Sequence, residues 1–157
     1  MIEVYSKDVT VASNQLIPFN IVALKKGATV TNSGSYEFVF NQCGIYELTV
    51  SAVATPVAAA AVKQSGTSAA AAQTGTSALA DEDSKVGIQL IKDGVAVPQA
   101  MSEESQTTAA ALSFTTLVQI NRNNSPCVCS TPVVCSINNI GSEATFSNVD
   151  VVITKIV

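Results

Sequence analysis

Apolar and polar residues alternate along most of this chain, which is the pattern of half-buried β-strands. The alternation is clearest over residues 45–53, where apolar side chains from Tyr46 to Ala52 share one face and polar ones from Glu47 to Ser51 share the other. No apolar stripe of useful length repeats at the 3.6-residue helical period. Similar runs recur at spacings of roughly 8–12 residues: 1–5, 9–12, 17–24, 28–31, 36–40, 86–92, 111–120, 133–137, 144–146 and 149–157. The pattern predicts an all-β fold of about ten strands, a two-sheet sandwich or jelly roll.

Turn residues separate these runs. Asp93-Gly94 is the dipeptide of a tight hairpin, and Gly34 follows a second short polar break. Pro98, Pro126 and Pro132 are expected in breaks between strands, where a missing N–H does no harm.

The final run differs from the others because it is apolar on both faces. Val151, Ile153 and Val157 fall on one face, whereas Val152 and Ile156 fall on the other. A strand of this kind is buried on both sides. In a two-sheet domain the second side needs something beyond the domain's own core, and another copy of the chain is the economical candidate.

Residues 54–85 form a low-complexity insertion of Ala, Ser, Thr and Gly. Its Ala runs are short and are interrupted by Gly66 and Gly75, which disfavours stable helices. We expect a long surface loop or small hairpin, either functional or disordered. The chain is therefore interpreted as one domain, 1–157, with this insertion at about 54–85.

The composition favours self-association and excludes several functions. The chain has 157 residues, enough for one domain with a proper core. Only 13% of them are charged, about half the usual share, which suggests a surface partly covered by copies of the chain. The net charge is −4 and the lysines are scattered, so nucleic-acid binding is not expected. No apolar stretch is long enough to span a membrane, and no signal peptide is evident, so we expect synthesis in a host cytoplasm.

Catalytic residues are scarce. The chain has no His, and no glycine-rich phosphate loop follows a strand, so we expect no enzyme, no catalytic residue and no cofactor. The carboxylates of Asp81, Asp83 and the pair Glu103-Glu104 lie in polar, loop-like sequence and are interpreted as solvated charges. A calcium site at Asp81 and Asp83 lacks the spacing of a known liganding loop.

The four cysteines match no common zinc pattern. Cys43, Cys127, Cys129 and Cys135 are interpreted as free thiols, some of them buried. The alternative is that Cys127 and Cys129 meet their symmetry mates around an axis. Whether Cys127, Cys129 and Cys135 are free, disulfide-bonded or metal-bound stays open.

Four segments resemble the tumour-necrosis-factor and complement-globular-head superfamily. Cys43-Gly44-Ile45-Tyr46 and the strand after it resemble a family strand in which Gly turns the chain and Tyr enters the core. Residues 86–95, 112–120 and 144–157 match the family's later strands in order and spacing. The resemblance covers the chain apart from the insertion. It implies a ten-stranded TNF-like jelly roll that forms a homotrimer, with the final strand in the sheet that faces the threefold axis.

Several segments of the sequence also resemble a narrower group of small bacterial and phage-borne proteins. The segments that carry this likeness are 18–27, 90–100, 112–120, 125–135 and 149–157. Such proteins resemble head-fibre or head-decoration components, and related jelly rolls cap collagen-like filaments of spore surfaces. This chain has no Gly-x-y repeat, so the filament-tip version is disfavoured.

The leading hypothesis is a structural virion protein, a homotrimeric decoration or fibre head on the surface of a phage capsid. We expect its trimer seam at Val152, Thr154 and Ile156. Its presenting loops, 54–85 and 121–132, include these residues: Gln64, Gly66, Gly75, Asp81, Asp83, Cys127 and Cys129. The alternative is an adhesion module of a phage or spore surface that binds host glycans or receptors through loops 54–85 and 99–110.

Overall fold

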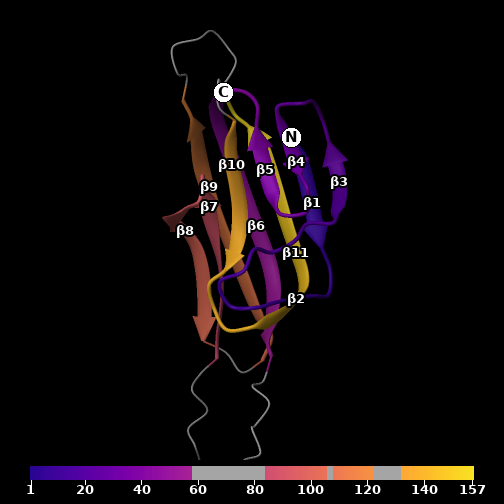
Figure 1. Cartoon of the computed structure of the whole chain (residues 1–157), viewed down its shortest axis with the longest axis vertical. Coiled ribbons are helices and arrows are strands. Elements are labelled where there is room, and N and C mark those ends of the chain that lie inside the picture. Colours follow the sequence, from indigo (N-terminus) through magenta and orange to yellow (C-terminus); the bar gives the residue numbers. More distant parts are fainter. Residues whose placement is uncertain (58–83, 106–107, 122–131) are drawn as a thin grey trace, which may run out of the picture.

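The chain folds as a sandwich of two antiparallel β-sheets (Figure 1). The computed structural model describes residues 1–57, 84–105, 108–121 and 132–157, and these contain eleven strands and no helix. The six-stranded sheet contains, in spatial order, β3 (Ile21–Lys25), β1 (Ile2–Ser6), β11 (Ala144–Lys155), β6 (Gly44–Pro56) and β9 (Ala110–Ile120), while β2 (Val9–Val11) pairs with the start of β11. The five-stranded sheet contains β4 (Val30–Ser33), β5 (Glu37–Phe40), β10 (Val133–Asn139), β7 (Lys85–Lys92) and β8 (Val95–Ser105). The prediction of a two-sheet antiparallel jelly roll is confirmed.

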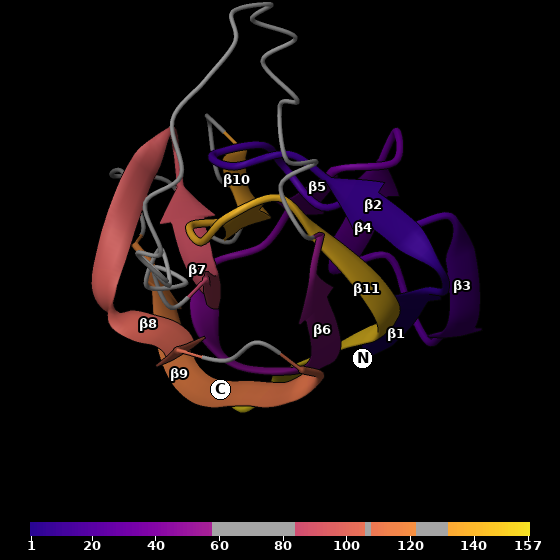
Figure 2. The ribbon, with the colours of Figure 1, turned by 90° about the horizontal axis from the view of Figure 1, so that it is seen from below.

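The core lies between the two sheets, which face each other when the molecule is seen along its strands (Figure 2). Aliphatic side chains fill most of it, and aromatic pairs anchor it. The Phe40 and Tyr46 rings meet edge to face at 4.8 Å, and the Phe19 and Phe38 centroids lie 5.2 Å apart. On one side β8 lies beside β9, so neither of these two edges is left fully open.

Several strand predictions were wrong. β8 was missed: only Ala100 among its residues is fully buried, so the run carries no clear alternation. Pro98 therefore lies inside a strand, but this is an edge strand, and Pro98 falls where the register with β7 shifts. Glu103-Glu104 also belongs to β8 and not to a loop, and Glu103 forms an ion pair with Lys85 at 3.6 Å.

The other errors concern strand limits. The runs 144–146 and 149–157 form one strand, β11, whose register with β6 shifts between Phe146 and Asn148. The ends of the predicted insertion 54–85 also belong to strands, because β6 continues to Pro56 and β7 begins at Lys85. The run 17–24 contains a strand only from Ile21, because the preceding segment crosses between sheets while burying Ile17 and Phe19. The final run ends as a strand at Lys155, so Ile156 and Val157 lie beyond it, with Val157 largely exposed.

The two predicted turns are confirmed. Gly34 has positive φ in the turn between β4 and β5. Asp93 and Gly94 both have positive φ and join β7 to β8, and the Asp93 carboxylate accepts a hydrogen bond from the Val134 N–H at 2.9 Å. Gly44 also has positive φ, and after it Tyr46 is fully buried and donates to the Gln42 carbonyl at 2.8 Å.

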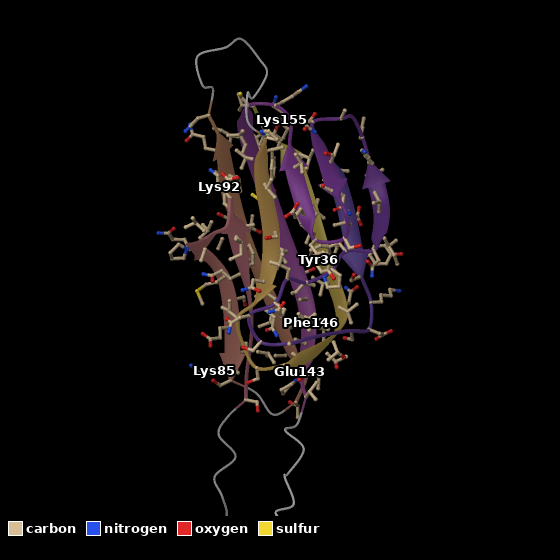
Figure 3. The ribbon with its side chains drawn as sticks, viewed as in Figure 1. Tyr36, Lys85, Lys92, Glu143, Phe146 and Lys155 are labelled. Carbon is tan, nitrogen blue, oxygen red and sulfur yellow. The ribbon has the colours of Figure 1, made fainter. Side chains whose placement is uncertain are left out.

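Gly44 fits its position because the end of the chain lies against it, at the Lys155 end of the sandwich (Figure 3). The Ile45 N–H donates to the Val157 carbonyl at 3.1 Å, and the Ile156 N–H donates to the Ile45 carbonyl at 2.8 Å. A Cβ on Gly44 would lie 2.1 Å from the Val157 carbonyl oxygen, and the φ of +149° disfavours any other residue.

We therefore expect Gly44→Ala to lower the free energy of unfolding by about 1–3 kcal/mol, measured by chemical denaturation. Gly34→Ala is the matched control: Gly34 also has positive φ, but a Cβ added there would meet nothing within 4 Å. Its cost should be the backbone strain alone, about 1 kcal/mol or less. Equal losses in both variants would contradict the packing argument at Gly44.

A buried amide organises the opposite end of the sandwich. The Asn139 side chain is fully buried, and its Nδ2 donates to the carbonyls of Val11, Ala12 and Ser142 at 3.0, 3.2 and 2.9 Å. Its Oδ1 accepts from the Gly141 N–H at 3.1 Å. One side chain thus connects the segment after β2 to the turn between β10 and β11.

Candidate assembly surface

The predicted trimer seam lies on the outer face of the six-stranded sheet. This face is made by the side chains of β1, β11, β6 and β9 that alternate with buried ones: Glu3, Tyr5, Asp150, Val152, Thr154, Glu47, Thr49, Ser51, Val53, Ser113, Thr115 and Leu117. The side chains at the centre of this face are small and weakly polar. The Thr49 and Thr115 hydroxyls lie 3.2 Å apart across β6 and β9, so they satisfy each other without a large projecting group.

The strand register fixes where the seam residues lie. Val152 stands between Glu3 on β1 and Thr49 on β6, in the middle of the face. Thr154 is opposite Glu47, toward the end of the sandwich where Lys155 lies. Val152 and Thr154 are half-buried in the single chain, whereas Ile156 is exposed and follows the strand. The structure thus brings Val152 and Thr154 onto one face and places Ile156 at its end.

Exposed apolar side chains gather around this face and its edges. Most of the large exposed apolar residues described belong to the six-stranded sheet or to the chain ends beside it: Met1, Ile21, Val22, Leu24, Val53, Leu117, Ile156 and Val157. Leu117 on the edge strand β9 is 63% exposed. β3, at the opposite edge, has five exposed residues and three large apolar ones. These side chains therefore lie mainly at the two edges and at one end of the sheet, on either side of the weakly polar centre.

The same face carries acidic residues at three outer positions, Glu3, Glu47 and Asp150. None of the described outer positions of β1, β6, β9 and β11 holds Lys or Arg. Burial, and after it the charge of Glu3, raises the pKa of the Asp150 carboxyl, while a hydrogen bond from the Val151 backbone opposes this. Sequence reasoning missed this group, because only the pairing of β1 with β11 brings Glu3 and Asp150 together.

The predicted presenting-loop residues lie outside the described part of the chain: Gln64, Gly66, Gly75, Asp81, Asp83, Cys127 and Cys129. The segment 99–110, predicted as a loop in the alternative hypothesis, is mostly strand, since β8 continues to Ser105 and β9 begins at Ala110. That loop prediction was wrong.

Cys135 is a buried thiol in β10, in keeping with the interpretation of some cysteines as small apolar residues. Burial raises the pKa of Cys135 to about 12, although Lys92 opposes the rise, so the thiol stays protonated at neutral pH. The Cys43 Sγ lies 3.6 Å from the Asn121 carbonyl oxygen, beside the corner made by Gly44.

Metal binding and membrane insertion gain no support from the described residues. No cluster of three or more His, Cys, Asp or Glu side chains in the described ranges is arranged to hold a metal ion. Among the same residues there is no helix of the length and apolar character needed to cross a membrane.

The two antiparallel sheets form a sandwich of the TNF-like jelly-roll type, and comparison with solved structures agrees. Murine APRIL superposes with a TM-score of 0.61 at 9% identity, over 99% of this chain and 98% of that one. The globular domain of zebrafish complement 1qA superposes at 0.56 with 8% identity, over 96% and 94%. The PRD1 vertex protein P5 superposes at 0.54 with 12% identity, over 99% and 96%. No protein-family model and no curated protein matches the sequence.

These likenesses establish the fold, and at such low identity they establish the fold alone. Each superposition covers nearly the whole of both chains, so the likeness extends over the entire domain and not over a shared hairpin. The fold that the resemblance around Cys43-Gly44-Ile45-Tyr46 implied is therefore confirmed.

Proposed function

We propose that this protein is a non-enzymatic structural module that forms a homotrimer through the outer face of its six-stranded sheet. The observation that carries the proposal is the concentration of exposed apolar side chains on this sheet and its edges. The low charge content supports it, because a lone monomer with 13% charged residues is poorly protected against association. Val152 and Thr154 belong to the seam in this proposal, and Ile156 closes it at one end.

The two edges of the six-stranded sheet both carry exposed apolar residues, as a ring of contacting copies requires. Leu117 on β9 and the apolar residues of β3 lie at opposite edges, so contact between copies is head-to-tail. A head-to-tail contact forms a closed ring when the rotation between copies closes.

We further propose that the trimer is a bacteriophage head decoration or head-fibre component, displayed on the capsid surface and bound to capsid proteins. Two observations support this location. The likeness to phage-borne head proteins is carried by several segments of the sequence, and the fold is shared with the PRD1 vertex protein P5. The function is then assembly and display, with no catalytic step.

Mass spectrometry of gradient-purified, washed virions tests the location. We expect the protein to co-purify with infectious particles, and antibody-gold labelling to mark the head. Its absence from washed particles, despite abundance in the lysate, would remove the virion assignment. Labelling confined to the tail would contradict the head assignment.

A further inference from the structure

Two carboxylates lie side by side near the middle of the outer face. Asp150 on β11 stands opposite Tyr5 on β1 and Ser51 on β6. Glu3, two residues before Tyr5, stands opposite Val152, so Glu3 is the diagonal neighbour of Asp150. Asp150 Oδ1 is buried and has no hydrogen-bond partner, although the residue as a whole is only half-buried.

The groups around Asp150 do not neutralise it. On β1 these are Glu3 and Tyr5, and on β6 they are Ser51, with Glu47 further along the strand. Lys7 follows β1, and its Nζ lies 5.8 Å from the centre of the Tyr5 ring, over which it stands. The carboxylate therefore already resists ionisation in the single chain, for the reasons of burial and repulsion from Glu3.

We infer that self-association through the outer face takes up protons at the Asp150 carboxyl, so that the assembly strengthens as the pH falls. The inference rests on the proposed function, because it is the neighbouring copies that bury this group further. Burying an ionised carboxylate without a partner costs several kcal/mol, and a protonated carboxyl avoids that cost.

The direction of the pH effect follows from linkage. Association removes water from the Asp150 carboxyl and brings its copies closer together, and both effects favour the protonated form. The assembled state then binds more protons than the separate chains, so lowering the pH favours assembly. The effect is fully present below the pKa of Asp150 in the free chain and is lost as the pH rises through its higher pKa in the assembly.

The test is sedimentation velocity of the full chain across a concentration series at about pH 8 and about pH 5, for the wild type and for Asp150→Asn. Asparagine keeps the shape of the side chain and removes its charge. We expect wild-type association to tighten toward about pH 5 and Asp150→Asn to tighten association at about pH 8 by roughly tenfold or more, since one pKa unit is tenfold in the equilibrium constant. The variant should also show a smaller response to pH.

Glu104→Gln is the matched control, since Glu104 is exposed on β8 in the other sheet. It should leave both the association and its pH response unchanged, and circular dichroism should show that each variant folds.

Two outcomes overturn the inference alone. One is a trimer of equal strength at both pH values. The other is weaker association of Asp150→Asn at about pH 8, because that loss would mean that a cation of the neighbouring copy pairs with the carboxylate. A chain that is monomeric at every pH and concentration overturns both the inference and the proposed trimer.

Discussion

Val152→Asp should convert the trimer into monomers while each monomer keeps its fold. Val152 is only half-buried in the single chain, so the new carboxylate can reach water there. In the proposed trimer the same position lies at the seam, where an unpaired buried charge costs about 3–5 kcal/mol. The opposing residue on β1 is Glu3, so the new charge would also meet a like charge.

In the proposed trimer this change occurs in three symmetry-related copies, so its total effect on the free energy of assembly is about three times that at one copy. Sedimentation velocity should show a single slow species, and circular dichroism should retain the β-sheet spectrum. Val95→Asp is the matched control, because Val95 is 68% exposed at the start of β8, in the other sheet. It makes the same chemical change and should leave the trimer intact. Trimers that persist in Val152→Asp would remove Val152 from the seam.

Asn139→Ala should give the largest loss of monomer stability among the single substitutions considered. It removes four hydrogen bonds and leaves the Val11 and Ser142 carbonyls and the Gly141 N–H without that partner, whereas the Ala12 carbonyl still accepts from the Gln15 N–H at 3.2 Å. Buried polar groups left unsatisfied cost about 1–3 kcal/mol each. Because the corner can relax and admit water, we expect a total loss of about 3–5 kcal/mol in the free energy of unfolding.

Gly141 limits how far that corner can relax. A Cβ placed on Gly141 would lie 2.4 Å from the Lys85 carbonyl oxygen, which shows how closely this turn packs on β7. Chemical denaturation of Asn139→Ala gives the loss. Asn138→Ala serves as the control: it is the preceding residue of β10, and its Oδ1 is buried without a hydrogen-bond partner. A loss in Asn138→Ala as large as that in Asn139→Ala would contradict the role given to the Asn139 network.

Much of the fold could be predicted because most strands bury one face and expose the other. β6 alternates almost perfectly, from buried Tyr46 to buried Ala54, so its period of two was unmistakable. β8 could not be found in this way. It lies at a sheet edge, contains Pro98 and buries little, so burial imposes no alternation on its sequence. The segment before β3 was wrongly predicted as strand for the opposite reason. Ile17 and Phe19 are buried, although most of that segment crosses between the sheets outside any strand.

The candidate surface was only partly predictable. Apolar residues on both faces of β11 indicated a second contact at Val152, and this needs no knowledge of the partner strands. The neighbours of Val152 and Asp150 come from β1, at the far end of the chain, and pairing over such a separation leaves no local signal in the sequence. The role of Asn139 was hidden likewise, because its acceptors in Val11 and Ala12 are distant in sequence.

The number of chains in the native particle decides whether the outer face of the six-stranded sheet is an assembly surface. Size-exclusion chromatography with multi-angle light scattering on the purified wild-type protein measures this without any substitution. We predict a molar mass of three times the 16.2 kDa of one chain, unchanged over a dilution series near neutral pH. A molar mass of one chain at every concentration would contradict the proposed trimer, and with it the assignment of the six-stranded sheet as an assembly surface.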